Sequence, residues 1–349
     1  MMKWQHLINR FIVTIAVTLS TTALAADEFD FYGAFKVSLN TSDDGDESNL
    51  SVSNNSSRVG IKGGKSLKDN MNLVYQLEME FDTTERERFN SGRNSFIGVE
   101  GDYGQILAGQ HDTPLKDIRA HGADIFGDTI ADIRSTISAV ADDSGTRLDI
   151  RARNAIMYKS PKENKTKLFF LYSADRDAND TPDDNSKDLV GISVMHVQGP
   201  VYVGLAYENQ SVPGAEDIDA IRFAGSYKFG DYQIGAIVES ADAGDNNSLT
   251  REAYAFNGRY NLTEKTWTGV QLGMVADYDG SSDTGATNIS AGISHDLADA
   301  TSVYAVISQT MNDDNASFGL SQGGIQDTVT AAFPGDDVSG ISVGLVHKF

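Results

Sequence analysis

Hydrophobic and polar residues alternate along most of the chain beyond its first 25 residues. From Phe29 to Asn40 the odd positions carry Phe, Phe, Gly, Phe, Val and Leu, whereas the even positions include Asp, Lys, Ser and Asn. From Met71 to Phe81 apolar residues again alternate with Asn, Gln and Glu. A period of two is typical of β-strands with one apolar face, and these segments are long enough to cross a bilayer when tilted. The same pattern recurs at residues 147–158, 201–208, 220–229, 232–238, 251–262 and 339–349.

Two kinds of connection separate these segments. Transmembrane barrels gather short turns at one end and long loops at the other, whereas the loop lengths of soluble sandwiches do not sort in this way. We therefore expect an all-β fold, a transmembrane antiparallel β-barrel of about 16 strands, although residues 82–110 and 287–310 are weakly patterned. The tight connections are 62–65, 101–104, 198–200 and 229–231, and the long acidic ones are 41–55, 174–188, 209–219, 240–250, 277–286 and 310–338.

The first 25 residues have the features of a signal peptide. Lys3 and Arg10 give a basic start, Phe11–Leu19 is a short apolar run, and Ala23–Ala25 reads as an A-x-A cleavage site. Residues 26–349 are then a single barrel domain. Removal of the two basic residues takes the formal net charge from −22 to −24.

Composition excludes several classes of protein. With 28 Lys and Arg against 50 Asp and Glu, the chain lacks the basic balance of a nucleic-acid binder. The absence of cysteine excludes disulfides, thiolate metal sites and a cysteine nucleophile. No Gly-x-Ser-x-Gly elbow occurs, and the glycines of 60–66 do not have phosphate-loop spacing because Val59 stands where glycine is required. We expect neither an enzyme nor a cofactor; the alternative is calcium held in the acidic outer loops.

One connection, residues 111–146, is longer than the others and lacks a strand pattern. Such segments inside a compact domain are usually functional. Its entry, Leu107–Asp117, resembles the strand end and loop entry of the general diffusion porins of Gram-negative outer membranes. Ile125–Thr129 is similar to the tip of their third loop, Arg151–Pro161 to the strand after it, and Val343–Phe349 to their closing strand. Gln110 departs from the family, in which arginine is common at this position.

The resemblance implies a 16-stranded homotrimeric barrel in the outer membrane whose third loop folds inward and narrows the pore. It also implies that Phe349 belongs to the signal read by the barrel assembly machinery. The expected surroundings are outer-membrane lipid and lipopolysaccharide, and the expected cargo is ions and small hydrophilic solutes.

Strand parity places several basic side chains inside the barrel. Between 147 and 156 the even positions are mostly apolar, so the arginines at odd positions share the other face. An arginine facing lipid near the middle of the membrane costs about 2–4 kcal/mol, so we expect these side chains in the lumen. The predicted basic wall of the constriction is Lys36, Arg58, Arg93, Arg147, Arg151 and Arg153.

The long loop supplies charge of the opposite sign through Asp117, Asp124, Asp128 and Asp132. If the loop folds inward, these carboxylates face the basic wall and create a transverse field that biases the passage of ions. The competing interpretation is that they are helix caps or solvated surface charge.

The function predicted is a water-filled channel for passive diffusion, with selectivity from the arginines facing the loop aspartates. Two alternatives stay open: a substrate-specific anion-type porin, and a non-conducting surface adhesin or calcium-binding barrel. The acidic loops favour cations at the mouth, whereas the arginines favour anions at the constriction. We expect a slight cation preference, because most of the acidic excess lies at the entrance.

Overall fold

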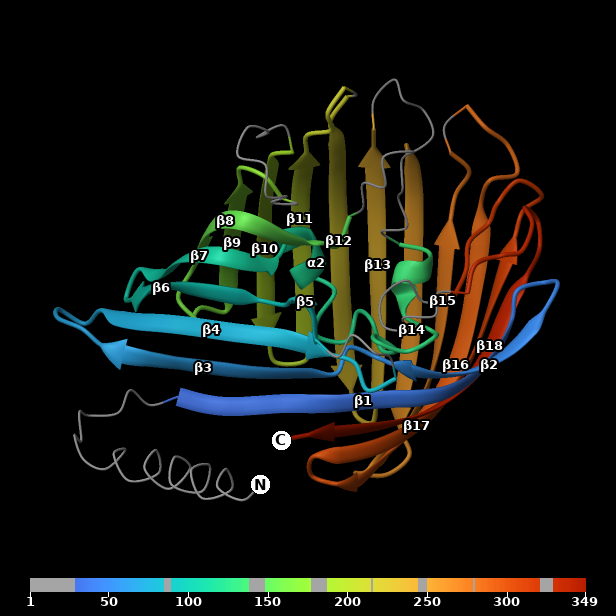
Figure 1. Ribbon diagram of the computed structural model, residues 1–349, viewed down its shortest axis with the longest axis horizontal. Coiled ribbons are helices and arrows are strands. Elements are labelled where there is room, and N and C mark those ends of the chain that lie inside the picture. Colours follow the sequence, from blue (N-terminus) through green and yellow to red (C-terminus); the bar gives the residue numbers. More distant parts are fainter. Residues whose placement is uncertain are drawn as a thin grey trace, which may run out of the picture.

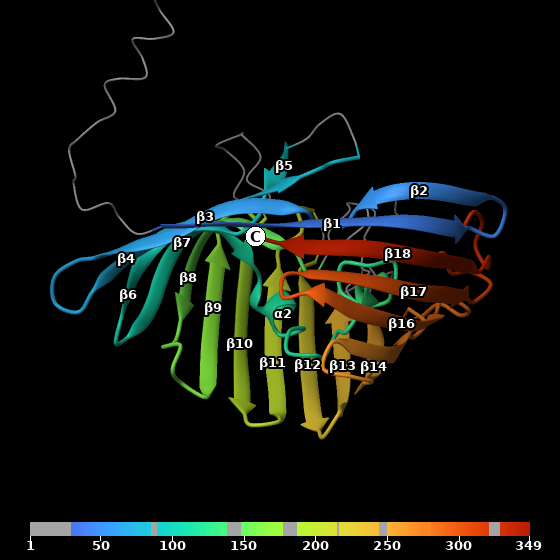
Figure 2. The same cartoon turned by 90° about the horizontal axis from the view of Figure 1, so that it is seen from below.

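The computed structural model describes residues 29–84, 89–137, 148–176, 187–214, 216–243, 250–278, 280–320 and 329–349, except the side chains of Asn90 and Ser91. The predicted signal peptide and Arg147 lie outside the described residues. Figures 1 and 2 show a sheet that curves around a central loop segment. Among the described residues, no helix is long and apolar enough to cross a membrane.

The described residues form one 18-segment antiparallel sheet. β2 and β3 both pair with β1, and β5 and β6 both pair with β4, so each of these two couples is one interrupted strand and the barrel has sixteen strands. The predicted fold and strand number are confirmed. The segments are β1 (Phe29–Asp43), β2 (Ser48–Asn54), β3 (Arg58–Ser66), β4 (Asn72–Phe81), β5 (Phe89–Gly92), β6 (Ser95–Gly101), β7 (Gly104–Asp112), β8 (Arg151–Lys159), β9 (Thr166–Ser173), β10 (Leu189–Gln198), β11 (Val201–Gln210), β12 (Ile218–Phe229), β13 (Tyr232–Asp242), β14 (Arg251–Asn261), β15 (Thr266–Val275), β16 (Ala286–Ala298), β17 (Thr301–Asn312) and β18 (Val338–Lys348).

The barrel closes where its first and last strands meet. β1 pairs with β18 from Ala34 opposite Lys348 to Asp43 opposite Ser339, and Figure 2 shows the two strands side by side. The terminal Phe349 extends this seam, because its backbone exchanges hydrogen bonds of 3.0 and 3.1 Å with Gly33. A Cβ on Gly33 would collide with the Phe349 ring, so the glycine makes room for the terminal aromatic side chain.

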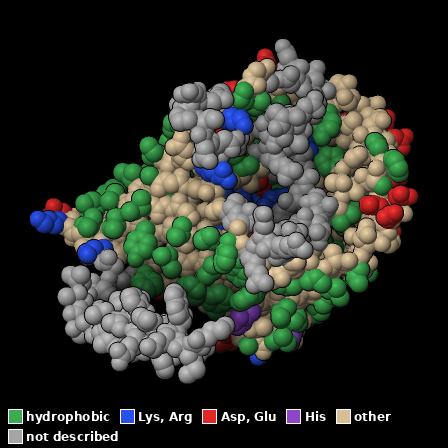
Figure 3. All heavy atoms as spheres, viewed as in Figure 1, with side chains coloured by type: hydrophobic (Ala, Val, Ile, Leu, Met, Phe, Trp, Pro, Cys, Tyr) green, Lys and Arg blue, Asp and Glu red, His purple; other side chains and the backbone are tan. Residues whose placement is uncertain are grey.

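The two faces of the sheet follow the alternation in the sequence. On β1, Phe31 and Leu39 are exposed on the outer face, whereas Ser38 and Asn40 are buried on the inner face. Aromatic rings stack along the outer ends of β12–β14, in the order Tyr227, Phe229, Tyr232 and Tyr260. Such aromatic girdles are typical of the membrane interface of barrels. Hydrophobic side chains are spread over the face of the molecule drawn in Figure 3.

The strand after the long loop begins later than the sequence predicts. The loop runs from 113 to 150, between β7 and β8, so the predicted bounds of 111–146 and the predicted strand start at 147 are wrong. Asp149 has a φ of 58°, a left-handed conformation that an extended strand does not contain. Its carboxylate is directed to side-chain partners described below instead of continuing the strand.

Candidate pore constriction

The constriction loop connects β7 to β8, and its described residues, 113–137 and 148–150, lie inside the barrel against the inner faces of β10–β16 (Figures 1 and 2). It starts with the short helix α2 (Pro114–Asp117), whose Thr113 side chain accepts a hydrogen bond from the Lys116 backbone as an N-cap. A 3₁₀ turn, Ile133–Ser135, is capped in the same way by Asp132. Leu115, Ile118 and Ile133 are fully buried in a cluster with wall residues such as Ala206 and Ala220, so apolar packing holds the loop to the wall.

Polar side chains on five successive strands hold backbone carbonyls of the loop. One residue from each of β11 to β15 donates a hydrogen bond, and the acceptors lie between 118 and 131. Three of these bonds are buried and two are partly buried, and together they fix the path of the loop. The bonds are Tyr202 to Ile118 (2.5 Å), Ser226 to His121 (2.6 Å), Gln233 to Gly122 (3.2 Å), Asn257 to Ala123 (2.6 Å) and Gln271 to Ala131 (2.9 Å).

Glycines in the wall permit this close approach. A Cβ on Gly235 would collide with the Gly122 carbonyl oxygen, and a Cβ on Gly273 would collide with the Thr136 hydroxyl. Both glycines point inward at positions where the neighbouring strands place larger side chains. The inner surface of β13 and β15 is therefore shaped to receive the loop backbone.

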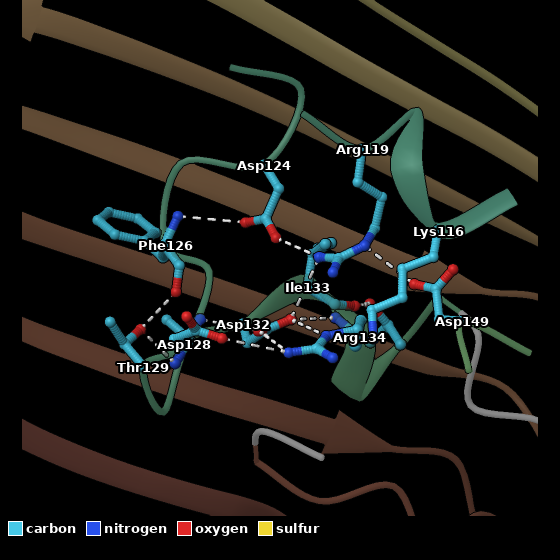
Figure 4. Close-up of polar contacts among 12 residues, drawn as sticks. Lys116, Arg119, Asp124, Phe126, Asp128, Thr129, Asp132, Ile133, Arg134 and Asp149 are labelled. Atoms are coloured by element: carbon cyan, nitrogen blue, oxygen red, sulfur yellow. Dashed lines mark hydrogen bonds and ion pairs between the residues drawn. The ribbon is translucent and has the colours of Figure 1, made fainter. Parts of the chain in front are cut away.

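Four of the loop's charged residues form a compact group (Figure 4). The Arg119 guanidinium lies 2.6 Å from Asp124 and 3.7 Å from Asp132, and Arg134 lies 2.8 Å from Asp132. Burial, with the nearby Asp132 carboxylate, raises the pKa of Asp124 to about 7. Burial also opposes ionisation of Asp132, but the Arg134 guanidinium prevails and holds the pKa of Asp132 well below its usual range.

A direct ion pair joins the loop to the predicted basic wall. The Lys36 ammonium on β1 lies 2.6 Å from the Asp128 carboxylate, which also lies 3.6 Å from Arg134. Asp128 reaches this position from a left-handed backbone conformation, φ 59°. The structure thus brings together one predicted wall cation and one predicted loop anion.

Other members of the basic wall have partners that sequence reasoning missed. Arg93 pairs with Glu78 (2.6 Å) and Glu80 (3.0 Å), and Arg58 lies 3.9 Å from Glu78. Both glutamates are on β4, at the inward positions of a strand that the sequence predicted correctly. Their alternation with the outward apolar residues of this strand could have identified them as lumen residues.

Arg151 pairs with the end of β7 instead of a loop aspartate. Its guanidinium lies 3.1 Å from Asp112, which also pairs with Lys116 at 2.8 Å. Arg153 is half-buried two residues further along β8. Asp117 forms no ion pair with the described residues, and burial raises its pKa.

A fully buried arginine on the opposite wall completes the group. Arg222 on β12 pairs with Glu239 on β13 and with Asp149 of the loop. It also donates a hydrogen bond of 3.0 Å to the Leu115 carbonyl. Asp149 in turn lies 2.9 Å from Arg119. A continuous ion-pair chain therefore crosses the lumen from β1 to β13, through Lys36, Asp128, Arg134, Asp132, Arg119, Asp149, Arg222 and Glu239.

The groups that take part in these ion pairs are equal in number on the two sides. Within the part of the chain that the structure describes, eight cations and eight carboxylates take part in the ion pairs given above. The cations are Lys36, Arg58, Arg93, Lys116, Arg119, Arg134, Arg151 and Arg222, and the carboxylates are Glu78, Glu80, Asp112, Asp124, Asp128, Asp132, Asp149 and Glu239.

No group of three or more His, Cys, Asp or Glu with the geometry of a metal site occurs in the described ranges. The outer loops include 177–186, 244–249 and 321–328, which lie outside those ranges. Calcium binding there stays a prediction.

Comparison with known proteins gives the family. The chain is 26% identical over 308 residues to outer membrane porin protein 32 of Delftia acidovorans, covering 84% of each chain. It is 30% identical over 190 residues to chitoporin of Vibrio furnissii, covering 49% of each. Among solved structures, the anion-selective porin from Comamonas acidovorans has a TM-score of 0.76 at 22% identity, covering 93% of this chain and all of that one. A family model described as Gram-negative porin matches residues 13–315. The chain therefore belongs to the Gram-negative porin family and forms an outer-membrane channel for passive diffusion.

Proposed function

We propose that this channel passes ions and small hydrophilic solutes with weak charge selectivity, because the charges of its constriction are paired with one another. The observation that carries the proposal is the ion-pair chain across the lumen, anchored at Lys36 on β1 and at Arg222 on β12. A passing ion experiences an unpaired charge more strongly than a compensated pair, since the fields of the two partners partly cancel.

The remaining charge selectivity of the channel comes from the acidic residues at the mouth of the pore. The first long connection carries Asp43, Asp44, Asp46 and Glu47 in succession, and the whole chain has a net charge of −22. Carboxylates at the mouth raise the local concentration of cations. Salt screens this effect over about 8 Å at 0.15 M, so the resulting preference for cations is slight.

Solute size is limited by the docked loop. The five hydrogen bonds from the wall and the apolar cluster around Leu115 keep the loop in the lumen. The proposed discrimination is therefore steric first and electrostatic second.

The wider surroundings of the channel are part of the same proposal. A homotrimer is supported by family membership, and one solved relative, OmpT of Vibrio cholerae, is described in a trimer form. Phe349, which ends the closing strand against Gly33, is the proposed signal for the assembly machinery. Lipopolysaccharide is the expected neighbour of the outer leaflet.

The test is the reversal potential of the refolded protein in a planar bilayer under a tenfold KCl gradient. The proposal predicts a small potential with the sign of cation preference. A large potential of anion sign would instead support the substrate-specific anion-type porin. Correctly folded, inserted protein without conductance would support the non-conducting alternative.

A further inference from the structure

Three histidines share one arrangement on the outer face of the barrel. In each case the histidine Nδ1 and a threonine hydroxyl on the neighbouring strand form a hydrogen bond, and the two residues are direct cross-strand partners. The pairs are His196 with Thr166 (2.9 Å), His295 with Thr266 (2.8 Å) and His347 with Thr301 (2.9 Å). These are three of the six histidines in the sequence.

The strand pattern places all three histidines on the membrane side. Each follows by two positions an exposed apolar residue, namely Val194, Ile293 or Leu345. Residues two apart on a strand share a face, so the imidazoles continue the apolar outer surface. All three pairs also lie at strand ends next to tight connections, the end at which short turns face the periplasm.

The depth of these pairs is that of the lipid headgroups. The stacked girdle of Tyr227, Phe229, Tyr232 and Tyr260 lies at the same end of the barrel, on β12–β14. Aromatic girdles mark the membrane–water interface. The histidine pairs flank it on β9–β10 and on β15–β18, and histidines appear beside hydrophobic side chains at the lower edge of the face in Figure 3.

Lysines accompany every pair. Lys165 directly precedes Thr166, Lys265 directly precedes Thr266, and Lys348 directly follows His347. Of the thirteen lysines beyond the signal peptide, only Lys36, Lys116 and Lys187 lie away from the tight-turn end, in a protein with a net charge of −22. Most acidic residues lie elsewhere, and those at the tight-turn end are Asp30, Asp69, Glu100, Asp102, Glu163, Asp231, Glu264, Asp296 and Asp299.

The chemistry of each pair favours an anion. When the threonine hydroxyl donates to Nδ1, the imidazole carries its proton on Nε2, which is then a free donor. In the described part of the chain, Nε2 of these three histidines has no other hydrogen-bond partner. A free N–H donor at the level of the headgroups is suited to a phosphate oxygen.

We propose that the three histidine–threonine pairs are binding sites for the headgroup phosphate of anionic phospholipids in the periplasmic leaflet, where Lys165, Lys265 and Lys348 next to them in sequence add positive charge to the same end of the barrel. The sites lie on the outside of the barrel and do not involve the constriction. Their failure would leave the proposed ion selectivity untouched, and the reverse also holds.

The test measures lipid retention by the folded barrel in detergent. The protein is titrated with phosphatidylglycerol or phosphatidylcholine, and bound lipid is counted by native mass spectrometry. We expect preferential retention of phosphatidylglycerol, and an affinity loss of about tenfold per site in H196A/H295A/H347A, the change expected for one hydrogen bond to a charged group. Inorganic phosphate at millimolar concentration is expected not to displace the lipid; displacement would show a free-anion site and overturn the assignment to lipid.

Two further variants keep the test decisive. T166V/T266V/T301V retains the imidazoles but removes the hydroxyls, and a reduced preference for phosphatidylglycerol is expected here too; it replaces the histidine variant if that protein does not fold. The control T41V/Q309A/S339A changes exposed outer-face residues at the long-loop end and should retain lipid like the wild type. Equal retention of the two lipids by the wild type, or unchanged retention in the folded variants, would overturn the proposal.

Discussion

At the residue scale, the contact between Lys36 and Asp128 is where the loop meets the first strand of the barrel. Substitution of one partner leaves the other charge uncompensated at the constriction. An ion passing about 5 Å from a single charge in water gains or loses about 0.8 kcal/mol, or about fourfold in relative permeability before screening. We therefore predict that Lys36→Met shifts the reversal potential toward cations and that Asp128→Asn shifts it toward anions.

The double variant Lys36→Met/Asp128→Asn is the matched control. It removes both charges and is expected to return close to the wild-type reversal potential. Shifts of the same sign in both single variants would contradict the paired-charge account.

Asp124 gives the constriction a dependence on pH. Because its pKa is raised from 3.8 to about 7, mainly by burial, its carboxylate is ionised at pH 8 and protonated at pH 5.5. Loss of this negative charge should lower the permeability ratio of cations to anions as the pH falls from 8 to 5.5. Reversal potentials measured across this range test the prediction, and Asp124→Asn should abolish that part of the dependence.

The same shift has a consequence for stability with a definite sign. Between the ordinary pKa of 3.8 and the folded value of about 7, the folded protein holds a proton that the unfolded chain has lost. The contribution of Asp124 to the free energy of unfolding therefore decreases as the pH rises through this window. A thermal midpoint that is higher for Asp124→Asn than for the wild type at pH 8, but equal for the two proteins at pH 4, would agree with this assignment.

Strand parity was sufficient to place Lys36 and Arg58 inside the barrel, because adjacent apolar residues identify the outer face. The ion-pair partners within the lumen could not be predicted in the same way. Glu239 and Arg222 stand on neighbouring strands in register, and Asp149 reaches them from the loop. Such pairing depends on cross-strand register and on the path of the loop, which the alternation of residue types does not encode.

At the scale of elements, the docking of the constriction loop depends on the inner face of β13. Gly235→Ala places a methyl group against the Gly122 carbonyl, whereas a Cβ on Gly258 of the adjacent strand has no heavy atom within 4 Å. Overpacking of this kind typically costs about 1–3 kcal/mol. We predict a lower thermal midpoint and an altered single-channel conductance for Gly235→Ala.

Gly258→Ala is the matched control, since it adds the same methyl group to open space. It should keep the thermal midpoint and conductance of the wild type. Equal effects of the two substitutions would show that the contact with Gly122 is not the cause.

The loop illustrates what local pattern can predict. Its length and lack of alternation marked it as a separate element, and its resemblance to a known family implied that it folds inward. Its end was misplaced because Arg147-Leu148-Asp149-Ile150 alternates like a strand, although Asp149 is held by Arg119 and Arg222 in a non-extended conformation. A tertiary ion pair here overrides a local strand pattern.

At the scale of the whole molecule, the two ends of the barrel differ in charge and shape. Tight turns, lysines and the aromatic girdle lie at one end, and long acidic loops lie at the other. The sixteen strands could be counted from the sequence because each crossing repeats the same period of two. The interruptions between β2 and β3 and between β5 and β6 could not be predicted from the sequence. Both halves of each interrupted strand keep the same partner strand, and only the backbone deviates.

The most direct measurement compares single-channel conductance of the wild type with that of a variant in which residues 119–134 are replaced by a short glycine–serine linker. Refolding to a heat-resistant barrel confirms that both proteins are intact. The account predicts a clearly larger conductance for the variant, because removal of the proposed constriction widens the channel. Equal conductance in the two folded proteins would contradict it.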